Sequence, residues 1–162
     1  MVNAAKERFI YSPEAMIKGF ARVSSDIVKT PSTELVVKWY RASYVDLQIW
    51  IDKNQDKVIR QQFSFLGLIV EWNHIQGIKT GYVLDKPEGS SESKGLEVIY
   101  DKVFEPKSVA QAIEVLSLAN TLPEKGEIIK NYENSPIISR WQSFLLIAKH
   151  LFAKQKTKNP SK

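Results

Sequence analysis

Alternating apolar and polar positions run through residues 44–84 and predict consecutive antiparallel strands. The clearest run is VDLQIWI, in which every second position from Val45 to Ile51 is apolar. The runs KVIRQQFSF, LIVEW and IKTGYVL follow, and Gly67 interrupts the pattern in a way that predicts a sharp bend or a bulge. With the run ELVVKWYR before this stretch and residues 96–100 after it, the pattern predicts an antiparallel meander of five or six strands.

Helical periodicity flanks the strands on both sides. Ser12-Pro13 is typical of a helix start, because serine caps free amide groups and proline suits the first helical position. An apolar stripe from Met16 to Ile27 follows, and Thr30-Pro31 predicts its end. Further helices are predicted from Pro106 and from Ser135-Pro136. The predicted class is α+β: a meander sheet of about five strands, flanked by one N-terminal helix and two or three C-terminal helices.

Length and composition predict one globular domain. The chain has 162 residues, of which 1–154 are expected to form a single α+β domain and 155–162 a disordered, lysine-rich tail. No cysteine is present, so disulfides and thiolate metal sites are excluded. No apolar run reaches the roughly 18 residues of a membrane span. The chain lacks the apolar core of a secretory signal near its first residue, and we expect a cytoplasmic protein.

The positive charge of the chain is concentrated at its C-terminal end. The formal net charge is +5, and five lysines lie from Lys149 onward, where there is no acidic residue. With those five set aside, 18 basic residues balance 18 acidic ones. Nucleic-acid-binding domains usually carry a basic patch on the fold itself. The neutral body therefore favours a protein partner over a polyanion.

One strand face combines aromatic and basic residues. By strand parity Trp50 lies on the polar side of its strand, and Tyr40 on the polar side of the preceding strand. We expect Arg60, Gln62 and Lys79 to share that face. Tryptophan, tyrosine and arginine are the residues enriched in protein-binding hot spots, and the same set stacks on planar ligands. The alternative is that a helix covers this face and Trp50 belongs to the core.

The helix predicted after Ser135-Pro136 carries the broadest apolar stripe in the chain. A helix that is apolar over much of its circumference is either central to a core or paired with another chain. The sequence therefore offers it as a dimer or partner helix, through Ile138, Trp141, Leu145 and Phe152.

Catalytic and metal-binding patterns are weak in this sequence. There are two histidines, at positions 74 and 150, too few for a typical zinc site, and no glycine-rich phosphate loop or nucleophile motif is present. We predict no metal and no cofactor. The strongest acid–base candidate is Glu71 with His74, supported by Arg60 and Asp46.

These observations lead to three hypotheses for function. The leading one is a non-enzymatic cytoplasmic adaptor or regulatory module that binds a protein through the aromatic sheet face or the C-terminal helix, with a homodimer as one form of that binding. The second is a module for nucleic acid or an anionic nucleotide, whose binding would collapse with added salt. The third is a small enzyme that uses Glu71 and His74.

Overall fold

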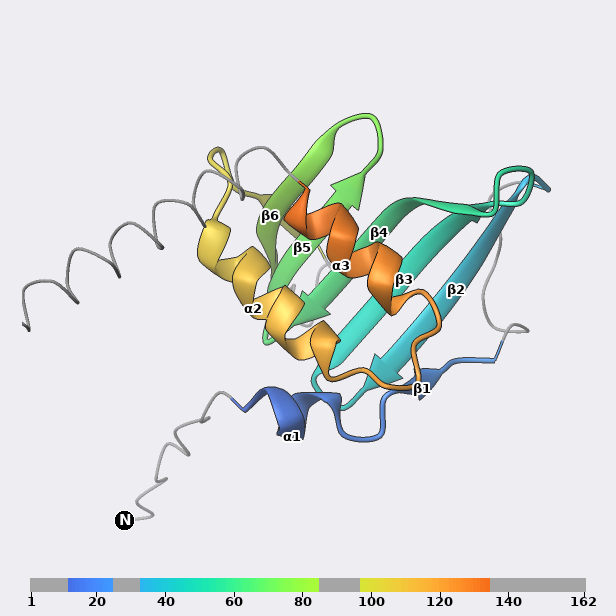
Figure 1. Cartoon of the computed structure of the whole chain (residues 1–162). Helices are drawn as coiled ribbons and strands as arrows, with labels where there is room; N and C mark the ends of the chain where they lie inside the picture. The colour runs from blue at the N-terminus through green and yellow to red at the C-terminus, as the bar shows by residue number, and fades with distance from the viewer. Residues whose placement is uncertain (1–11, 25–32, 85–96, 135–162) are drawn as a thin grey trace, which may run out of the picture.

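The computed structural model describes residues 12–24, 33–84 and 97–134. These residues form a seven-stranded antiparallel sheet and three helices (Figure 1). In chain order the elements are α1 (Pro13–Ile17), β1 (Ala21–Arg22), β2 (Leu35–Ala42), β3 (Val45–Asp52), β4 (Lys57–Phe65), β5 (Leu68–Asn73), β6 (Gly77–Leu84), β7 (Glu97–Tyr100), α2 (Pro106–Ser117) and α3 (Lys125–Glu133). The strands pair in the order in which they occur in the chain.

The predicted α+β class with an antiparallel meander is confirmed, but the count of about five strands was too low. The strand that the pattern missed is β1, which consists of two residues, too few to show an alternation. Gly67 marks a tight turn between β4 and β5, where Leu66 and Gly67 have φ angles of 51° and 77°. Such a two-residue turn with positive φ at both positions suits the twist of a hairpin.

The N-terminal helix is much shorter than its apolar stripe predicted. It begins at Pro13, capped by Ser12, but ends at Ile17. Gly19 then has a φ of 75°, a left-handed conformation that turns the chain out of the helix. The segment that follows pairs with β2 as strand β1, so tertiary pairing overrides the helical period here. The predicted end of the helix lies outside the described residues.

The two faces of the sheet differ sharply in their surroundings. One, the covered face, packs against α2 and α3, which lie side by side across the sheet (Figure 1). Fully buried residues from both layers make up the core: Leu47, Ile49, Phe63, Val70, Val109, Ala112, Val115, Leu116, Ile128 and Tyr132. The opposite face, the open face, carries no described helix.

A β-bulge near the start of β4 helps to hold α3 in place. Trp50 pairs with Arg60 but Ile51 pairs with Val58, so Ile59 is the extra residue. The backbone N–H of Val58 donates to the carboxylate of Glu127 in α3, at 3.0 Å. A bulge leaves backbone groups without partners in the neighbouring strand. Here Glu127 of α3 supplies the partner for the N–H of Val58.

Buried polar side chains complete the attachment of α3. Gln61 has no exposed surface, and its amide nitrogen donates to the carbonyl oxygen of Ile128 at 2.9 Å. Asn131 donates to the amide oxygen of Gln61 at 2.9 Å. The hydroxyl of Tyr132 donates to the carbonyl oxygen of Val70 at 3.0 Å, and burial raises the pKa of this tyrosine strongly. Leaving a buried group of this kind unpaired costs about 1–3 kcal/mol.

Tyr40 lies on the covered face, so its predicted place beside Trp50 is wrong. It pairs with Leu47, is 3% exposed and stacks on Phe20 with ring centroids 5.7 Å apart. The turn between β2 and β3 consists of two residues, and Ala42 therefore pairs with Val45. This pairing puts Tyr40 on the face of the apolar residues of β3.

A charged cluster ties β2 to the segment that leads into α3. Glu124 accepts hydrogen bonds from Lys38 at 2.5 Å and from the hydroxyl of Tyr40 at 3.1 Å. Burial alone would raise the pKa of Glu124, but the hydrogen bonds from Lys38, its own backbone and Tyr40, with the charge of Lys38, lower it on balance. Tyr40 responds in the opposite direction: burial and the charge of Glu124 raise its pKa to about 12.

The predicted C-terminal helix, with Ile138, Trp141, Leu145 and Phe152, lies outside the described residues. So do the N-terminal arm, residues 1–11, and the predicted tail, residues 155–162. The single-domain boundary at residue 154 stays a prediction.

We expect Gly81→Ala to destabilise the protein by about 1–3 kcal/mol, the usual cost of overpacking. A Cβ at position 81 would overlap the carbonyl oxygen of Ile99 and lie 3.0 Å from the Cα of Tyr100, so β6 and β7 would have to separate. Urea unfolding measures the effect. Gly126→Ala is the matched control, because a Cβ there has nothing within 4 Å and alanine favours the helix. Equal stability of the two variants would contradict this account of the β6–β7 contact.

We expect Glu124→Gln to flatten the acid part of the stability profile. A carboxyl whose pKa is lowered on folding stabilises the protein above its unfolded value of 4.5, and this contribution is lost as pH falls through the lower folded value. Chemical unfolding at a series of acid pH values measures the slope. The exposed Glu133 offers a control, since Glu133→Gln removes a carboxylate from α3 without touching Lys38 or Tyr40. A profile unchanged by Glu124→Gln would refute the assignment.

Candidate functional site

The open face is the candidate site. Its side chains come from β2 to β7, and the strand pairing places them on one surface: Trp39, Arg41, Asp46, Gln48, Trp50, Arg60, Gln62, Ser64, Glu71, Lys79 and Tyr100. Residues that pair across antiparallel strands point to the same side, which is why the register decides this membership.

The centre of the open face is built around Arg60. Its guanidinium carbon lies 4.4 Å from the centroid of the Trp50 ring. One of its terminal nitrogens donates to the carboxylate of Glu71 at 2.9 Å. Arg60 thus joins β3 to β5 through one cation–π contact and one ion pair.

Tyr100 reaches the same carboxylate from the edge of the sheet. Its hydroxyl donates to the oxygen of Glu71 that also accepts from Arg60, at 2.7 Å. Tyr100 pairs with Gly81, which has no side chain, so the ring can cross β6 to reach β5. Lys79 stands over this ring, its amino nitrogen 5.7 Å from the centroid. Burial, followed by the hydrogen bond and charge of Glu71, raises the pKa of Tyr100 to about 12.

A second cluster of an aromatic ring, a cation and a carboxylate lies on β2 and β3, toward the opposite edge of the sheet from Tyr100. The guanidinium carbon of Arg41 is 5.5 Å from the centroid of the Trp39 ring. Asp46 accepts a hydrogen bond from the indole nitrogen of Trp39 and forms an ion pair with Arg41 at 3.4 Å. Burial raises the pKa of Asp46, although the hydrogen bond from Trp39 and the charge of Arg41 oppose the shift. Every Trp and Tyr of the open face, as far as it is described, has a cation over its ring.

Two glutamines lie between these groups. Gln48 pairs with Gln62 across β3 and β4, and Trp39 and Glu71 flank them in the same row. Neither amide has a side-chain hydrogen bond within the described residues, and both are half-buried. Since an amide offers two donors and two acceptor positions, this row is the place where a ligand could be bound by hydrogen bonds.

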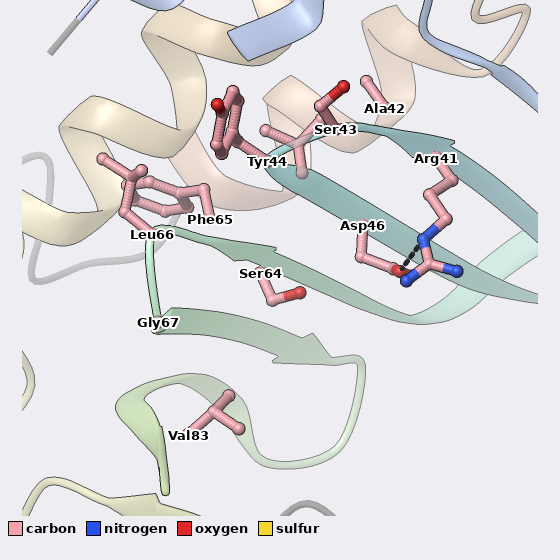
Figure 2. Close-up of a pocket in the computed structure, with 11 residues that line it drawn as sticks. Arg41, Ala42, Ser43, Tyr44, Asp46, Ser64, Phe65, Leu66, Gly67 and Val83 are labelled. Carbon is pink, nitrogen blue, oxygen red and sulfur yellow. Dashed lines mark ion pairs between the residues drawn. The ribbon is translucent and has the colours of Figure 1, made fainter. Parts of the chain in front are cut away.

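A hollow of about 370 Å³ lies at the end of the open face, beside the β2–β3 and β4–β5 turns (Figure 2). Tyr44 and Leu66 lie on one side of it, and the Arg41–Asp46 ion pair on the other. Leu66 has a left-handed φ of 51° and is 40% exposed, an uncommon combination for a large apolar side chain. The hollow adjoins the open face through Asp46.

The register places Arg60, Gln62 and Lys79 on the face of Trp50, as the parity of the strands predicted, while Tyr40 lies on the other side of the sheet. The role of these residues in binding stays a prediction. Sequence reasoning missed Trp39, which the two-residue turn after β2 would have assigned. It also missed Tyr100, whose pairing with β6 bridges residues 85–96 and has no local signal.

Glu71 and His74, the candidate acid–base pair, have separate partners. Glu71 is 6% exposed and accepts from Arg60 and Tyr100. The backbone N–H of His74 donates to the carbonyl oxygen of Ile59 at 3.0 Å, and the ring Nδ1 lies at hydrogen-bond distance from that oxygen, also 3.0 Å. His74 therefore contacts the carbonyl oxygen of the bulged residue Ile59, and it has no contact with Glu71 among the described hydrogen bonds.

The part of the chain that the structure describes holds no group of three or more His, Asp or Glu side chains suited to a metal ion. Within residues 12–24, 33–84 and 97–134, no helix has the length and apolar character that crossing a bilayer requires. Comparison with protein-family models, with curated proteins and with solved structures gave no match. The open face is therefore interpreted from its own chemistry.

We expect Glu71→Gln to lower the pKa of Tyr100 from about 12 toward its ordinary value of 10, because the variant removes the negative charge at the hydroxyl. Burial should keep the pKa above 10. An NMR titration of ¹³C-labelled tyrosine follows the change. Because a raised tyrosine pKa stabilises the folded state below pH 10 and this contribution is lost through about 12, the variant should also be less sensitive to alkali.

Glu97→Gln, an exposed carboxylate on the same strand as Tyr100, is the control for this titration. If the two variants leave the pKa of Tyr100 equally high, the Glu71–Tyr100 contact does not exist in solution.

Proposed function

We propose that this protein is a non-enzymatic cytoplasmic adaptor or regulatory module that binds a protein partner through the open face. The observation that carries the proposal is the set of three cation–π pairs: Arg41 over Trp39, Arg60 over Trp50 and Lys79 over Tyr100. Tryptophan, tyrosine and arginine dominate the energetic centres of protein interfaces.

The contacts beneath these pairs support a preorganised surface. Asp46 holds Arg41 and Trp39, and Glu71 holds Arg60 and Tyr100. Side chains that are already held lose less conformational entropy when a partner binds, and more of the contact energy then appears as affinity.

The row formed by Gln48 and Gln62 supplies the hydrogen-bonding capacity of this surface. An amide without a protein partner is bonded to water, and a partner that covers it must replace those bonds. Backbone groups of a peptide can do so, since each residue presents one donor and one acceptor. A protein partner therefore matches the central row as well as the aromatic groups.

The same geometry disfavours the alternative, a nucleic-acid or nucleotide module. A base stacks on an uncovered aromatic ring. The rings of Trp39, Trp50 and Tyr100 each have a cation over them. A base would have to displace that cation, although a carboxylate also binds each arginine and the side chain of Gln76 accepts a hydrogen bond from Lys79.

We predict that replacing both Gln48 and Gln62 by alanine weakens partner binding about tenfold or more, while stability changes little. A random peptide-display library would be selected on the immobilised wild-type protein. Calorimetry would then give the dissociation constant of each selected peptide for the wild type and for the double variant. Gln55→Ala is the matched control, because this glutamine lies on the exposed β3–β4 loop.

Two outcomes would refute the proposal. The first is a set of selected peptides that bind the double variant as tightly as the wild type. The second is a library that yields no binder while a single-stranded oligothymidylate binds the open face. Both are read from the same titrations, with unfolding curves to show that the variants fold.

A further inference from the structure

We propose that the open face recognises an acidic, extended peptide segment whose carboxylates occupy positions i and i+4. This inference rests on the proposed function and deepens it by naming the chemistry of the partner. It follows from the layering of charge on the open face, the unused donors of Arg60, and the spacing between Arg60 and Lys79.

In both ion pairs of the open face the cation is more exposed than the carboxylate. The side chain of Arg41 is 63% exposed but that of its partner Asp46 is 26% exposed. The side chain of Arg60 is 38% exposed, whereas that of Glu71 is 9% exposed. Lys79 is exposed as well. The carboxylates lie low and the cations stand above the rings, so an approaching partner meets positive charge. Two protein surfaces bind selectively when their electrostatic potentials are complementary.

Arg60 has donors that no described side chain uses. It gives one hydrogen bond, to an oxygen of Glu71 that also accepts from Tyr100. Its Nε is buried and without a hydrogen-bond partner, so the donors open to a partner are those of its terminal nitrogens. A guanidinium has five donors in a planar fork and binds carboxylates in pairs of parallel hydrogen bonds. A carboxylate from a partner would use the donors that Glu71 leaves free.

The spacing of the cations sets the spacing of the partner's carboxylates. Lys79 lies two strands from Gln62, through the pairs Gln62–Glu71 and Glu71–Lys79, and Arg60 lies two residues before Gln62. With strands about 4.8 Å apart and a rise of about 3.3 Å per residue, the Cα atoms of Arg60 and Lys79 are roughly 12 Å apart.

An extended peptide matches this distance and a helical one does not. Residues i and i+4 of an extended chain point to the same side and lie about 13 Å apart. In a helix the same pair lies about 6 Å apart. The segment between the two carboxylates would cross β5 between Glu71 and Asn73, with Gln62 to one side at about one strand spacing.

Three synthetic peptides of about ten residues, built from serine and threonine, test the proposal. The first carries glutamate at i and i+4, the second glutamate at i and i+3, and the third glutamine at i and i+4. Each is titrated into the ¹⁵N-labelled full chain, and amide and indole shifts report where it binds. We expect the first peptide to bind at least about fivefold more tightly than the others and to shift the indole signal of Trp50.

Lys79→Gln should remove the advantage of the first peptide over the second, because Arg60 alone can bind one carboxylate at either spacing. Lys107→Gln is its control, because Lys107 is exposed on α2, on the other side of the sheet. A difference between the first and second peptides that survives Lys79→Gln would overturn the assignment of this lysine and with it the proposal. Preserved unfolding curves keep the comparison valid.

The remaining outcomes separate this inference from the proposed function. If all three peptides bind the open face equally, the acidic specificity is wrong while a protein-binding face stands. If none binds, the inference fails, and the display-library selection alone decides whether the face binds protein. If an oligothymidylate binds there and neither the first peptide nor any member of the display library does, both proposals fail.

Discussion

The position of α3 on the sheet depends on polar groups that are buried and must be paired. Gln61 has no exposed surface and forms hydrogen bonds with the helix through both ends of its amide. The hydroxyl of Tyr132 and the carboxylate of Glu127 add bonds to the sheet backbone. Apolar packing alone would tolerate a shift of the helix along the sheet, because the hydrophobic effect is non-directional. A shift would leave several of these groups unpaired, at about 1–3 kcal/mol each.

The position of α3 on the covered face also decides the surroundings of the open face. Because the described helices pack on the covered face, the side chains of the opposite face pair with one another. Trp39, Trp50 and Tyr100 lie under cations, and the carboxylates of Asp46 and Glu71 are held low on the surface. A solvated sheet face usually carries charges at random sign and depth. Here the cations are more exposed than the carboxylates, and this outward positive charge is the basis for proposing an acidic protein partner.

Much of the fold could be predicted from the sequence because strand periodicity is a local property. The alternation from Val45 to Ile51 matches the buried and half-buried positions of β3 throughout. A long-range effect caused the failure at α1. The apolar stripe after Met16 resembles a longer helix than α1, but Gly19 ends it and the next residues pair with β2. The error at Tyr40 has a local cause: parity within one strand does not say which side of the sheet a residue faces, and the two-residue turn between β2 and β3 is what sets it.

Period-two patterns and short turns along the chain were enough to predict the α+β class, the antiparallel meander and three residues on the same side of the sheet as Trp50. The folded structure was needed to show that the described helices share one face, that Tyr40 is buried against Glu124, and that Tyr100 reaches Glu71 across Gly81. The physical reason is that side-chain direction is set locally by the backbone. Which partner a side chain meets depends on strands and helices that are distant in the chain.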